Sequence, residues 1–408
     1  MGSCRICASP LTQTFVDLGC SPLANSYLRE TELEQMEPHY PLHAYVCAQC
    51  LLVQIREFQS PERIFRDYLY FSSVSTTWLD HARSYAENMI ERLDLSQRSL
   101  VLEIASNDGY LLRWFQERGV PVLGVEPAIN VAQAAQAIGI PTRSEFFDAA
   151  YAQQLRSEGL QADLIVANNV VAHVPDLLDF LAGIKIVLKA HGVATFEFPH
   201  VLNLVLENQF DTIYHEHVSY FSLLSLEWPL KLCGLTAFDV EFLATHGGSL
   251  RVFVRHIEDD SKSDGDGVSQ TRQKEVNARL HELSGYSGFE SRVADVKCVL
   301  LSFLISCRQS GKRVSAYGAP AKGNTLLNYC GIGPELVPYT VDQSSHKVGL
   351  FLPGTHIPIY EPKRLLEERP DYVLILPWNL RREVADQMSG IREWGGQFVT
   401  PIPSLEVF

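Results

Sequence analysis

The sequence predicts an α/β protein built around a mostly parallel central sheet, with a small metal-binding module before that sheet and a second α/β domain after it. Three observations predict this arrangement. Two CxxC pairs lie near the start of the chain, short apolar strands alternate with amphipathic helices from residue 100 onward, and a second alternating set begins at residue 312. The chain has 408 residues, more than one hydrophobic core usually spans. We therefore expect three units, at residues 1–75, 76–258 and 259–408.

Composition narrows the class of protein. The chain carries 34 Lys and Arg against 48 Asp and Glu, a net charge of −14, and has no long basic run. This excess of negative charge disfavours electrostatic binding to a phosphate backbone, so no nucleic-acid partner is expected. The first residues do not form an export signal, and no stretch of about 18 uninterrupted apolar residues occurs. We expect a cytoplasmic enzyme without a membrane partner, acting as a monomer or weak homo-oligomer.

The cysteines of the two CxxC pairs predict a zinc site. A CxxC turn lets two thiolates converge on one ion, and two such turns complete a tetrahedral shell of four sulfurs. Residues 40–46 and 51–55 are typical of short strands that return the second pair to the first. A closed shell leaves no open position for substrate, so the zinc would be structural; the alternative is four unrelated thiols. The predicted ligands are Cys4, Cys7, Cys47 and Cys50.

The remaining cysteines occur singly along the chain. With them the total is nine, an odd number that argues against a disulfide framework in a chain without an export signal. Their neighbours are mostly apolar, so we expect buried packing residues. They are Cys20, Cys233, Cys298, Cys307 and Cys330.

The central sheet is predicted from short apolar runs separated by amphipathic helices. Strands are expected at residues 100–104, 122–125, 164–167 and 193–198, and helices at residues 110–118, 128–138 and 176–188. Two further strands, residues 235–242 and 250–255, flank the tight-turn sequence His-Gly-Gly-Ser. An antiparallel hairpin that closes a mostly parallel sheet is usual in methyltransferase sheets and unusual in dinucleotide-binding folds.

The turn after the first strand is the expected cofactor site, since ligands bind at the carboxyl ends of parallel strands. Small residues at 105–109 let backbone amides approach a ligand, and Glu126 can accept hydrogen bonds from two ribose hydroxyls. This geometry alone suits NAD as well as S-adenosylmethionine. Ala105 and Asn107 stand where a pyrophosphate-binding loop would have glycine, which favours S-adenosylmethionine. Cofactor contacts are expected from Glu103, Ala105, Ser106, Asn107, Gly109, Tyr110, Glu126, Pro127, Asn168 and Asn169.

Several motifs follow one another in a recognisable order. After the first cysteine pair they are Pro22-Leu-Ala-Asn25, Tyr68-Leu-Tyr70-Phe-Ser-Ser73, the 103–109 loop, Asn168-Asn-Val-Val-Ala-His173, Tyr214-His-Glu-His217, His246-Gly-Gly-Ser249 and Tyr317-Gly-Ala-Pro-Ala-Lys-Gly-Asn324. Over essentially its whole length the chain resembles the bacterial sugar C-methyltransferases, which methylate a carbon, typically C3, of a nucleotide-linked 4-keto-deoxysugar. The resemblance implies a class I, Rossmann-like methyltransferase domain that uses S-adenosylmethionine, between a zinc-binding module and a C-terminal Rossmann-like domain. One departure is Ala105, where the family more often has glycine; its methyl group should narrow the cofactor cleft slightly.

The chemistry of such an enzyme explains the residues that the resemblance implies. A ketone at C4 acidifies the C3 proton, so a base can remove that proton while a donor steadies the enolate oxygen. The resemblance implies that His217 is the base, and histidine suits the role because its unperturbed pKa of about 6.5 lies near working pH. It also implies active-site positions for Tyr68, His173, Tyr214 and Glu216.

Alternatives stay open at several of these positions. The hydroxyl of Tyr68, or that of its neighbour Tyr70, could donate to O4 of the sugar. His173 could orient the sugar or stabilise the enolate, yet judged alone it is equally typical of a satisfied core histidine. Glu216 could be a salt-bridge partner only, and His215 is expected to be structural.

A second, smaller sheet is predicted in the last third of the chain. The acidic, glycine-bearing stretch 258–267 is typical of a solvated connector, and helices are expected at residues 270–284 and 289–310, the second capped by Gly311. Strands are expected at residues 312–317, 337–342, 372–376 and 397–401, with helices that end near residue 329 and span residues 380–393.

The first strand-to-helix turn of this second sheet is a candidate anion site. Helix N-termini hold phosphates through backbone amides, and Lys322 adds a positive charge. We expect the diphosphate of the sugar nucleotide to contact Lys322, Gly323 and Asn324; the alternative is a loop that only packs against the central domain. Asp342 and Lys347 could touch the nucleotide or merely cap the loop.

The leading interpretation is therefore an S-adenosylmethionine-dependent C-methyltransferase that acts at C3 of a nucleotide-linked 4-keto-6-deoxy sugar, with thymidine as the base by analogy to the family. One alternative is an NAD-dependent oxidoreductase or epimerase acting on the same sugar nucleotides. Another is a zinc-ribbon interaction protein on a degenerate methyltransferase fold.

Overall fold

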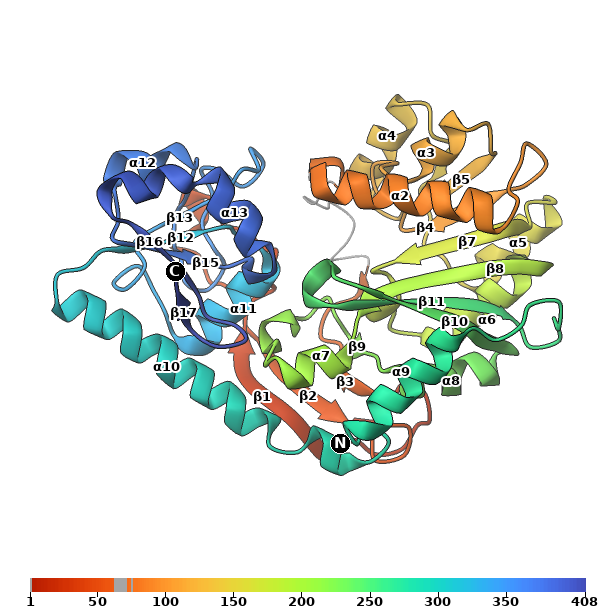
Figure 1. Ribbon diagram of the computed structural model, residues 1–408, viewed down its shortest axis with the longest axis horizontal. Coiled ribbons are helices and arrows are strands. Elements are labelled where there is room, and N and C mark those ends of the chain that lie inside the picture. The colour runs from red at the N-terminus through yellow and green to blue at the C-terminus, as the bar shows by residue number, and fades with distance from the viewer. Residues whose placement is uncertain (1, 62–71, 75) are drawn as a thin grey trace.

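The computed structural model describes residues 2–61, 72–74 and 76–408, and contains three sheets (Figure 1). A seven-stranded sheet forms the central unit, on the right of Figure 1, and a six-stranded sheet forms the C-terminal unit, on the left. A four-stranded sheet near the N-terminus lies below and between them. One of its strands pairs with a strand from the central part of the chain, and β1 contacts helices of the C-terminal unit.

The central sheet has the strand order β10-β11-β8-β7-β4-β5-β6. The five strands β4 to β8 run parallel, and β11 runs antiparallel between β8 and β10, which confirms the predicted closing hairpin. The two-residue strand β6 was not predicted, because two residues are too few to show an alternation of apolar and polar side chains. The strands are β4 (Val101–Ile104), β5 (Val122–Val125), β6 (Thr142–Arg143), β7 (Ala162–Asn168), β8 (Leu188–Pro199), β10 (Leu235–Leu243) and β11 (Ser249–His256).

Two hydrophobic cores lie on the two faces of this sheet. Alternate residues of a strand point to opposite faces, so Val101 packs with the α2–α3 side and Leu102 with the α5–α6 side. The predicted helices α3, α4 and α6 are confirmed, shortened by one or two residues at their ends, whereas α2, α5, α7, α8 and α9 were not predicted with these bounds. The helices are α2 (Thr76–Arg92), α3 (Leu112–Glu117), α4 (Ile129–Ala137), α5 (Ala149–Ser157), α6 (Leu177–Val187), α7 (Val201–Leu206), α8 (Leu223–Leu232) and α9 (Asp266–Asn277).

The N-terminal sheet is antiparallel, with the order β1-β2-β3-β9. The prediction for residues 40–46 is confirmed, while the strand predicted at 51–55 begins only at Val53, since Leu51 has the left-handed φ of 59°. The strand β9 lies far along the chain, after β8, and was not predicted. The strands are β1 (Gln13–Ser21), β2 (Tyr40–Val46), β3 (Val53–Ile55) and β9 (Ser219–Tyr220).

The C-terminal sheet has the order β14-β13-β12-β15-β16-β17, with β17 as its only antiparallel strand among the described residues. The predicted helix at 289–310 is confirmed as α10, and Gly311 after it has a φ of 71°. The elements are α10 (Phe289–Gln309), β12 (Val314–Tyr317), α11 (Ala321–Cys330), β13 (Thr340–Val341), β14 (Ile359–Tyr360), α12 (Lys363–Glu368), β15 (Tyr372–Ile375), α13 (Arg381–Gln387), β16 (Gln397–Thr400) and β17 (Glu406–Val407).

Two helix predictions in this region are wrong in extent. The helix expected at 270–284 spans 266–277 instead, because Arg279 takes a left-handed φ of 63° and ends it. The helix expected at 380–393 is α13 followed by a separate 3-10 helix, Ser389–Trp394, since Met388 between them leaves the helical conformation with φ −105° and ψ 22°.

The single cysteines only partly follow the expectation of burial. Cys307 and Cys330 are buried and Cys233 is half-buried, but Cys20 and Cys298 are exposed. Cys20 lies on β1 and Cys298 on α10, and in each case the outer side of the element faces solvent.

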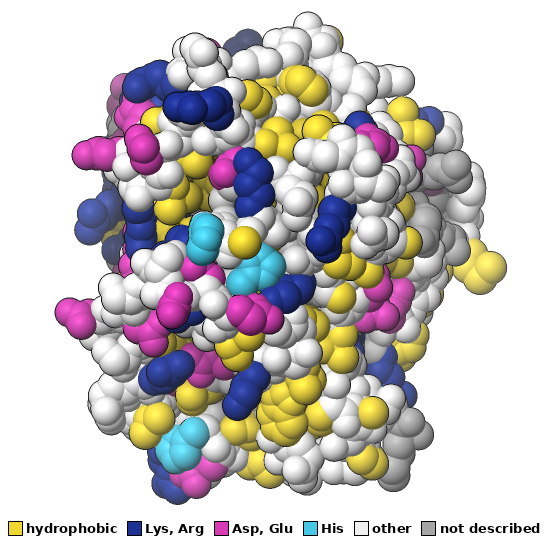
Figure 2. All heavy atoms as spheres, turned by 90° about the vertical axis from the view of Figure 1, so that its right-hand side faces the viewer, with side chains coloured by type: hydrophobic (Ala, Val, Ile, Leu, Met, Phe, Trp, Pro, Cys, Tyr) yellow, Lys and Arg dark blue, Asp and Glu magenta, His cyan; other side chains and the backbone are white. Residues whose placement is uncertain are grey.

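Charged side chains of both signs are interspersed over the face of the molecule in Figure 2, which is the right-hand side of Figure 1. Within the described residues, none of the helices is at once long enough and apolar enough to cross a bilayer.

Candidate active site

The four predicted zinc ligands converge in space. Sγ of Cys4 lies 3.4 Å from Sγ of Cys50, Sγ of Cys7 lies 3.4 Å from Sγ of Cys47, and all four sulfurs lie within 4.8 Å of one another. In a tetrahedral zinc site with Zn–S bonds of about 2.3 Å, neighbouring sulfurs lie about 4 Å apart. The observed separations are close to this value, so the cluster fits zinc. The side-chain amide of Gln54 donates to Cys4 Sγ at 3.2 Å, the kind of outer support that thiolate ligands receive.

The cysteine module is hydrogen bonded to the segment that carries the predicted base. Strand β3 pairs with β9, so Val53 stands opposite Tyr220 and Gln54 opposite Ser219. The backbone N–H of Ile55 donates to the carbonyl of Val218 at 3.2 Å. The backbone immediately after residue 217 is therefore part of the N-terminal sheet.

The loop after β4 has the tight geometry of a ligand cradle. Ala105 and Asn107 have left-handed φ values of 53° and 50°, and Gly109 has a φ of 79°. A Cβ on Gly124 of the adjacent β5 would lie 2.4 Å from Ser106 Oγ, so the loop sits directly on the strand. An alanine at position 105 is strained in this backbone conformation, which glycine adopts readily.

Buried polar atoms at the carboxyl ends of β4 and β7 fit S-adenosylmethionine. Ser106 Oγ, Asp108 Oδ1 and Asn168 Oδ1 are buried and have no hydrogen-bond partner among the described residues. Such atoms are rare unless a ligand or water satisfies them. The loop therefore offers unsatisfied donors and acceptors at the place where the cofactor is expected.

Glu126 closes this cradle from β5. One carboxylate oxygen accepts from the N–H of Asn107 at 2.9 Å and the other from the N–H of Ala128 at 2.8 Å. Burial raises the pKa of Glu126 although both N–H groups oppose the shift. Each oxygen keeps a further lone pair for a hydroxyl. Nearby, burial raises the pKa of Glu103 well above its usual value.

The other predicted cofactor residues surround the same loop. Tyr110 is buried, and its ring lies 6.0 Å from that of Trp78 on α2; Pro127 is half-buried after Glu126. Asn169 has a left-handed φ of 56°, and its N–H donates to the carbonyl of Glu197 at 2.7 Å. The predicted set thus gathers at one edge of the central sheet.

His217 has its two ring nitrogens in different environments. Nδ1 lies 3.0 Å from the carbonyl oxygen of Thr212 and Nε2 lies 2.7 Å from the hydroxyl of Tyr214. Because a carbonyl only accepts, Nδ1 carries the hydrogen in the neutral ring and Nε2 is the basic atom. Burial, with the neighbouring His173 next, holds the pKa of His217 well below its usual value. The imidazole is therefore neutral, as a base must be.

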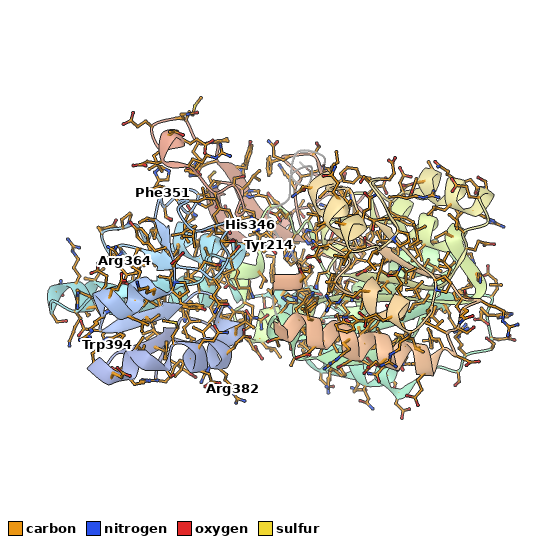
Figure 3. The ribbon with its side chains drawn as sticks, turned by 90° about the horizontal axis from the view of Figure 1, so that it is seen from above. Tyr214, His346, Phe351, Arg364, Arg382 and Trp394 are labelled. Atoms are coloured by element: carbon orange, nitrogen blue, oxygen red, sulfur yellow. The ribbon has the colours of Figure 1, made fainter. Side chains whose placement is uncertain are left out.

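His173 and Glu216 lie beside this base. The rings of His173 and His217 are 4.6 Å apart in an edge-to-face arrangement, and burial lowers the pKa of His173 to about 4. Nδ1 of His173 donates to the carbonyl of Glu216 at 2.8 Å. Figure 3 labels Tyr214 of the same segment, which lies where the central and C-terminal units meet.

Asn25 is a site residue that the motifs contained but that was assigned no role. Its side-chain amide donates to Oε1 of Glu216 at 2.7 Å. The neighbouring carbonyl of Ala24 accepts from the side chain of Asn324 at 2.6 Å. The motifs around residues 25, 216 and 324 thus meet, and their joint presence in the sequence was the available signal.

The predicted Tyr68 and Tyr70 lie outside the described residues. The segment that follows them is tied to the cofactor loop, since the N–H of Ser72 donates to Asn107 Oδ1 at 2.9 Å and that of Ser73 to Asp108 Oδ2 at 3.1 Å.

Lys322 lies close to the predicted base. Its Nζ donates to Asn379 Oδ1 at 2.9 Å and lies 4.7 Å from the centre of the Trp378 ring. Burial lowers the pKa of Lys322, and its charge contributes to the lowered pKa of His217. The indole N–H of Trp378 donates to Asp211 Oδ2 at 2.7 Å, and burial raises the pKa of Asp211 to about 6.

The other predicted substrate residues take two different positions. Asp342 accepts from the N–H of Ala319 at 2.7 Å, and Lys347 donates to the carbonyl of Ala319 at 2.8 Å, so both lie at the strand-to-helix turn. Gly323 and Asn324 face inward; a Cβ on Gly323 would lie 2.9 Å from Leu376 Cβ.

Three domain families match the chain in order. One described as zinc binding covers residues 4–65, one described as a methyltransferase domain covers residues 78–240, and the C-methyltransferase C-terminal domain covers residues 244–403. The C-methyltransferase NovU of Streptomyces niveus is 34% identical over 404 residues, which are 99% of this chain and 96% of NovU.

Solved methyltransferase structures also match, at low similarity. An S-adenosylmethionine-dependent methyltransferase from Clostridium acetobutylicum is 13% identical with a TM-score of 0.36, over 44% of this chain and 92% of its own. The CcbJ methyltransferase of Streptomyces caelestis is 13% identical with a TM-score of 0.34, over 43% of this chain and 89% of its own.

The strand order and the polar loop after β4 define a class I methyltransferase, with S-adenosylmethionine as methyl donor and a four-cysteine zinc module. The chain belongs to the family of C-methyltransferases that includes NovU. The prediction of a C-methyltransferase is thereby confirmed over the oxidoreductase alternative.

Proposed function

We propose that this C-methyltransferase acts at C3 of a nucleotide-linked 4-keto-6-deoxy sugar, with dTDP as the nucleotide, in deoxysugar biosynthesis. The observation that supports it most is the environment of His217. A neutral imidazole with Nδ1–H held by the Thr212 carbonyl presents one basic nitrogen, Nε2, which is what removal of a proton beside a ketone requires.

The donor supplies an electrophilic methyl group on a sulfonium. His217 Nε2 takes the C3 proton, and the resulting enolate gives C3 its nucleophilic character. In the resting arrangement the Tyr214 hydroxyl occupies Nε2 at 2.7 Å. Either the Tyr214 hydroxyl moves away from Nε2 when the sugar binds, or it relays the C3 proton from the sugar to Nε2.

Glu216 and His173 would orient the sugar. Asn25 holds one carboxylate oxygen of Glu216, and the Glu216 carbonyl fixes the His173 ring. The ring of His173 lies 4.6 Å from that of His217, so a hydroxyl or amino substituent next to the keto carbon would meet His173 and the adjacent Glu216. Tyr68 or Tyr70, which lie outside the described residues, would supply a further hydroxyl, as the resemblance implies.

The nucleotide would bind on the C-terminal unit. The turn before α11 gathers backbone amides with Lys347 and Asp342, which suits a polar nucleotide. Lys322 is the second residue of α11, directly after this turn, and its charge acts on His217, so it would face the diphosphate next to the reacting sugar ring.

A panel of keto-sugar nucleotides incubated with S-adenosylmethionine tests the proposal. We expect a mass gain of one methyl group on a 4-keto-6-deoxy sugar nucleotide and none on the matching 4-hydroxy sugar, because only the ketone acidifies C3. Wild-type protein that methylates none of the keto sugars would contradict the proposed substrate.

The base assignment is tested by His217→Asn. Loss of a general base should lower turnover by about 10²–10⁴-fold, with affinity for S-adenosylhomocysteine nearly unchanged. His215→Asn is the matched control, because His215 Nε2 faces the backbone carbonyls of Tyr40 and Pro41 at 3.3 Å. Retained turnover in His217→Asn would remove this residue as the base.

A further inference from the structure

The turn between β10 and β11 holds His246 in an unusual backbone conformation. His246 has φ 55° and ψ 18°, in the left-handed region that non-glycine residues rarely adopt. The two glycines after it are tightly enclosed: a Cβ on Gly247 would lie 2.5 Å from the Trp378 ring, and one on Gly248 2.0 Å from Asn203 Nδ2. The surroundings thus fix the turn, and strain of this kind is typical of functional positions.

A second left-handed residue fixes the His246 ring. Asn169, at the end of β7, has a φ of 56°, and its side-chain Nδ2 lies 3.4 Å from His246 Nε2. An amide nitrogen only donates, so Nε2 accepts and the hydrogen of the neutral ring is on Nδ1. Within the described part of the chain, no acceptor is hydrogen bonded to Nδ1 of His246.

In the other two histidines of the site, His173 and His217, the ring N–H already donates to a backbone carbonyl. Nδ1–H of His173 donates to the Glu216 carbonyl and Nδ1–H of His217 donates to the Thr212 carbonyl. In their neutral forms neither ring has a second N–H for a ligand. His246 is therefore the imidazole of this group that can donate a hydrogen bond to a substrate oxygen.

His246 and His217 flank the same strand end. The N–H of His200 donates to the Gly248 carbonyl at 3.1 Å, and Ser249 pairs with Pro199 at the end of β8. A small cavity of about 10 Å³ beside His217 is lined by Phe198 and Pro199. Burial, with the charge of Lys322 next, lowers the pKa of His246 to about 4, so this ring is neutral at working pH.

We propose that His246 is a further catalytic residue, whose Nδ1–H donates a hydrogen bond to the enolate oxygen of the keto substrate. The inference rests on the proposed function. The C3 proton goes to His217 Nε2, the C3–H electron pair forms the C3–C4 double bond, and the carbonyl π pair moves to O4, which His246 stabilises. A neutral imidazole serves this role well because its N–H is closer in acidity to an enol than an imidazolium is.

The test is exchange of the C3 hydrogen with deuterated water, in the presence of S-adenosylhomocysteine in place of the methyl donor. Exchange reports enolate formation without methyl transfer. Two variants suit the left-handed backbone: His246→Gly removes the donor, and His246→Asn puts an amide N–H where Nδ1 stands. His246→Asp, which has the shape of the Asn variant without the donor, replaces His246→Gly if that variant does not fold.

We expect His246→Gly to slow exchange by about 10²-fold, the usual effect of one oxyanion donor, and His246→Asn to recover most of that loss. Affinity for S-adenosylhomocysteine should change little in both. Exchange at the wild-type rate in His246→Gly, or an equal loss in both variants, would overturn the proposal. Failure of the proposed function looks different: the wild-type protein itself would then neither exchange nor methylate the sugar.

Discussion

A single hydrogen bond to a neighbouring group indicates which ring nitrogen carries the hydrogen in each histidine of the site. His173 and His217 both donate through Nδ1 to carbonyls, whereas His246 accepts through Nε2 from an amide. The same residue type would therefore serve as a base at one position and as a donor at another, as proposed above. The sequence motifs predicted His217 and His173 but not this division, because tautomers depend on partners from other segments.

The pH dependence of the rate follows from the His217 environment. Burial and the adjacent His173 lower its pKa, so the neutral, basic form persists below pH 6.5 and activity is lost only as the pH falls through the lowered pKa. We expect the acid limb of kcat/KM below 6.5. Burial, the larger cause of the lowered pKa of His217, is unchanged in His173→Gln, so the acid limb of that variant should also stay below pH 6.5. An acid limb at or above 6.5 in the wild-type protein would contradict the assignment.

Ala105 predicts a stabilising substitution. Its φ of 53° is strained for alanine, so Ala105→Gly should raise the free energy of unfolding by about 0.5–1 kcal/mol after the entropy cost of glycine. The control is Ala150→Gly at an exposed position of helix α5, where glycine should lower the free energy of unfolding by about 0.5–1 kcal/mol. Denaturant unfolding measures both, and a loss of stability in Ala105→Gly would contradict the strain.

Among the secondary-structure elements, those of the cysteine module are hydrogen bonded to the segments that carry His217 and His173. Strand β3 pairs with β9, and Arg5, between two zinc ligands, donates to the carbonyls of Ile55 at 2.8 Å and Pro175 at 3.1 Å. Pro175 follows His173 by two residues. Zinc held by the four cysteines would therefore order the backbone that carries His173 and His217, and its closed sulfur shell would leave no position for substrate.

Zinc removal should loosen β9 before it unfolds the central sheet. After chelation we expect the amide of Tyr220 to lose protection against hydrogen exchange, while amides of β4 keep theirs. Turnover should fall in parallel and return when zinc is added back. Unchanged protection of β9 in protein shown by metal analysis to be zinc-free would contradict this role.

Longer elements were predictable because their residues carry a pattern of their own. β5 and α4 follow from continuous apolar runs and helical spacing, and their predicted bounds agree within one residue. Two-residue strands such as β6 and β9 have no such pattern and exist because a neighbouring strand pairs with them. These strands depend on pairing with other strands of the fold, and sequence periodicity contains no information about that pairing.

At the scale of the whole molecule, the site is a junction of three units. Asn25 reaches Glu216 across 191 residues, and Trp378 reaches Asp211 across 167. The residues of the YHEH motif were predicted, since one short segment contains them. Their partners were not, because contacts between such distant segments appear only once the three units pack together.

Docking of the C-terminal unit should matter for catalysis. Trp378→Phe leaves the buried Asp211 without its indole donor, which should lower the free energy of unfolding by about 1.5–3 kcal/mol. Because Thr212 follows Asp211 and its carbonyl accepts from His217, a shift of Thr212 should also lower kcat by about tenfold or more. Trp394→Phe is the control, because Trp394 donates to the carbonyl of Pro370 inside the C-terminal unit. Equal kcat in both variants would show that the contact with Asp211 does not position the base.

The most direct measurement is a crystal structure of the protein with S-adenosylhomocysteine and a keto-sugar nucleotide bound. We expect Nε2 of His217 to lie within reach of the C3 hydrogen, on the face of the sugar opposite the sulfur atom. A sugar bound with C3 turned away from His217, or with His217 on the same face as the sulfur, would contradict it.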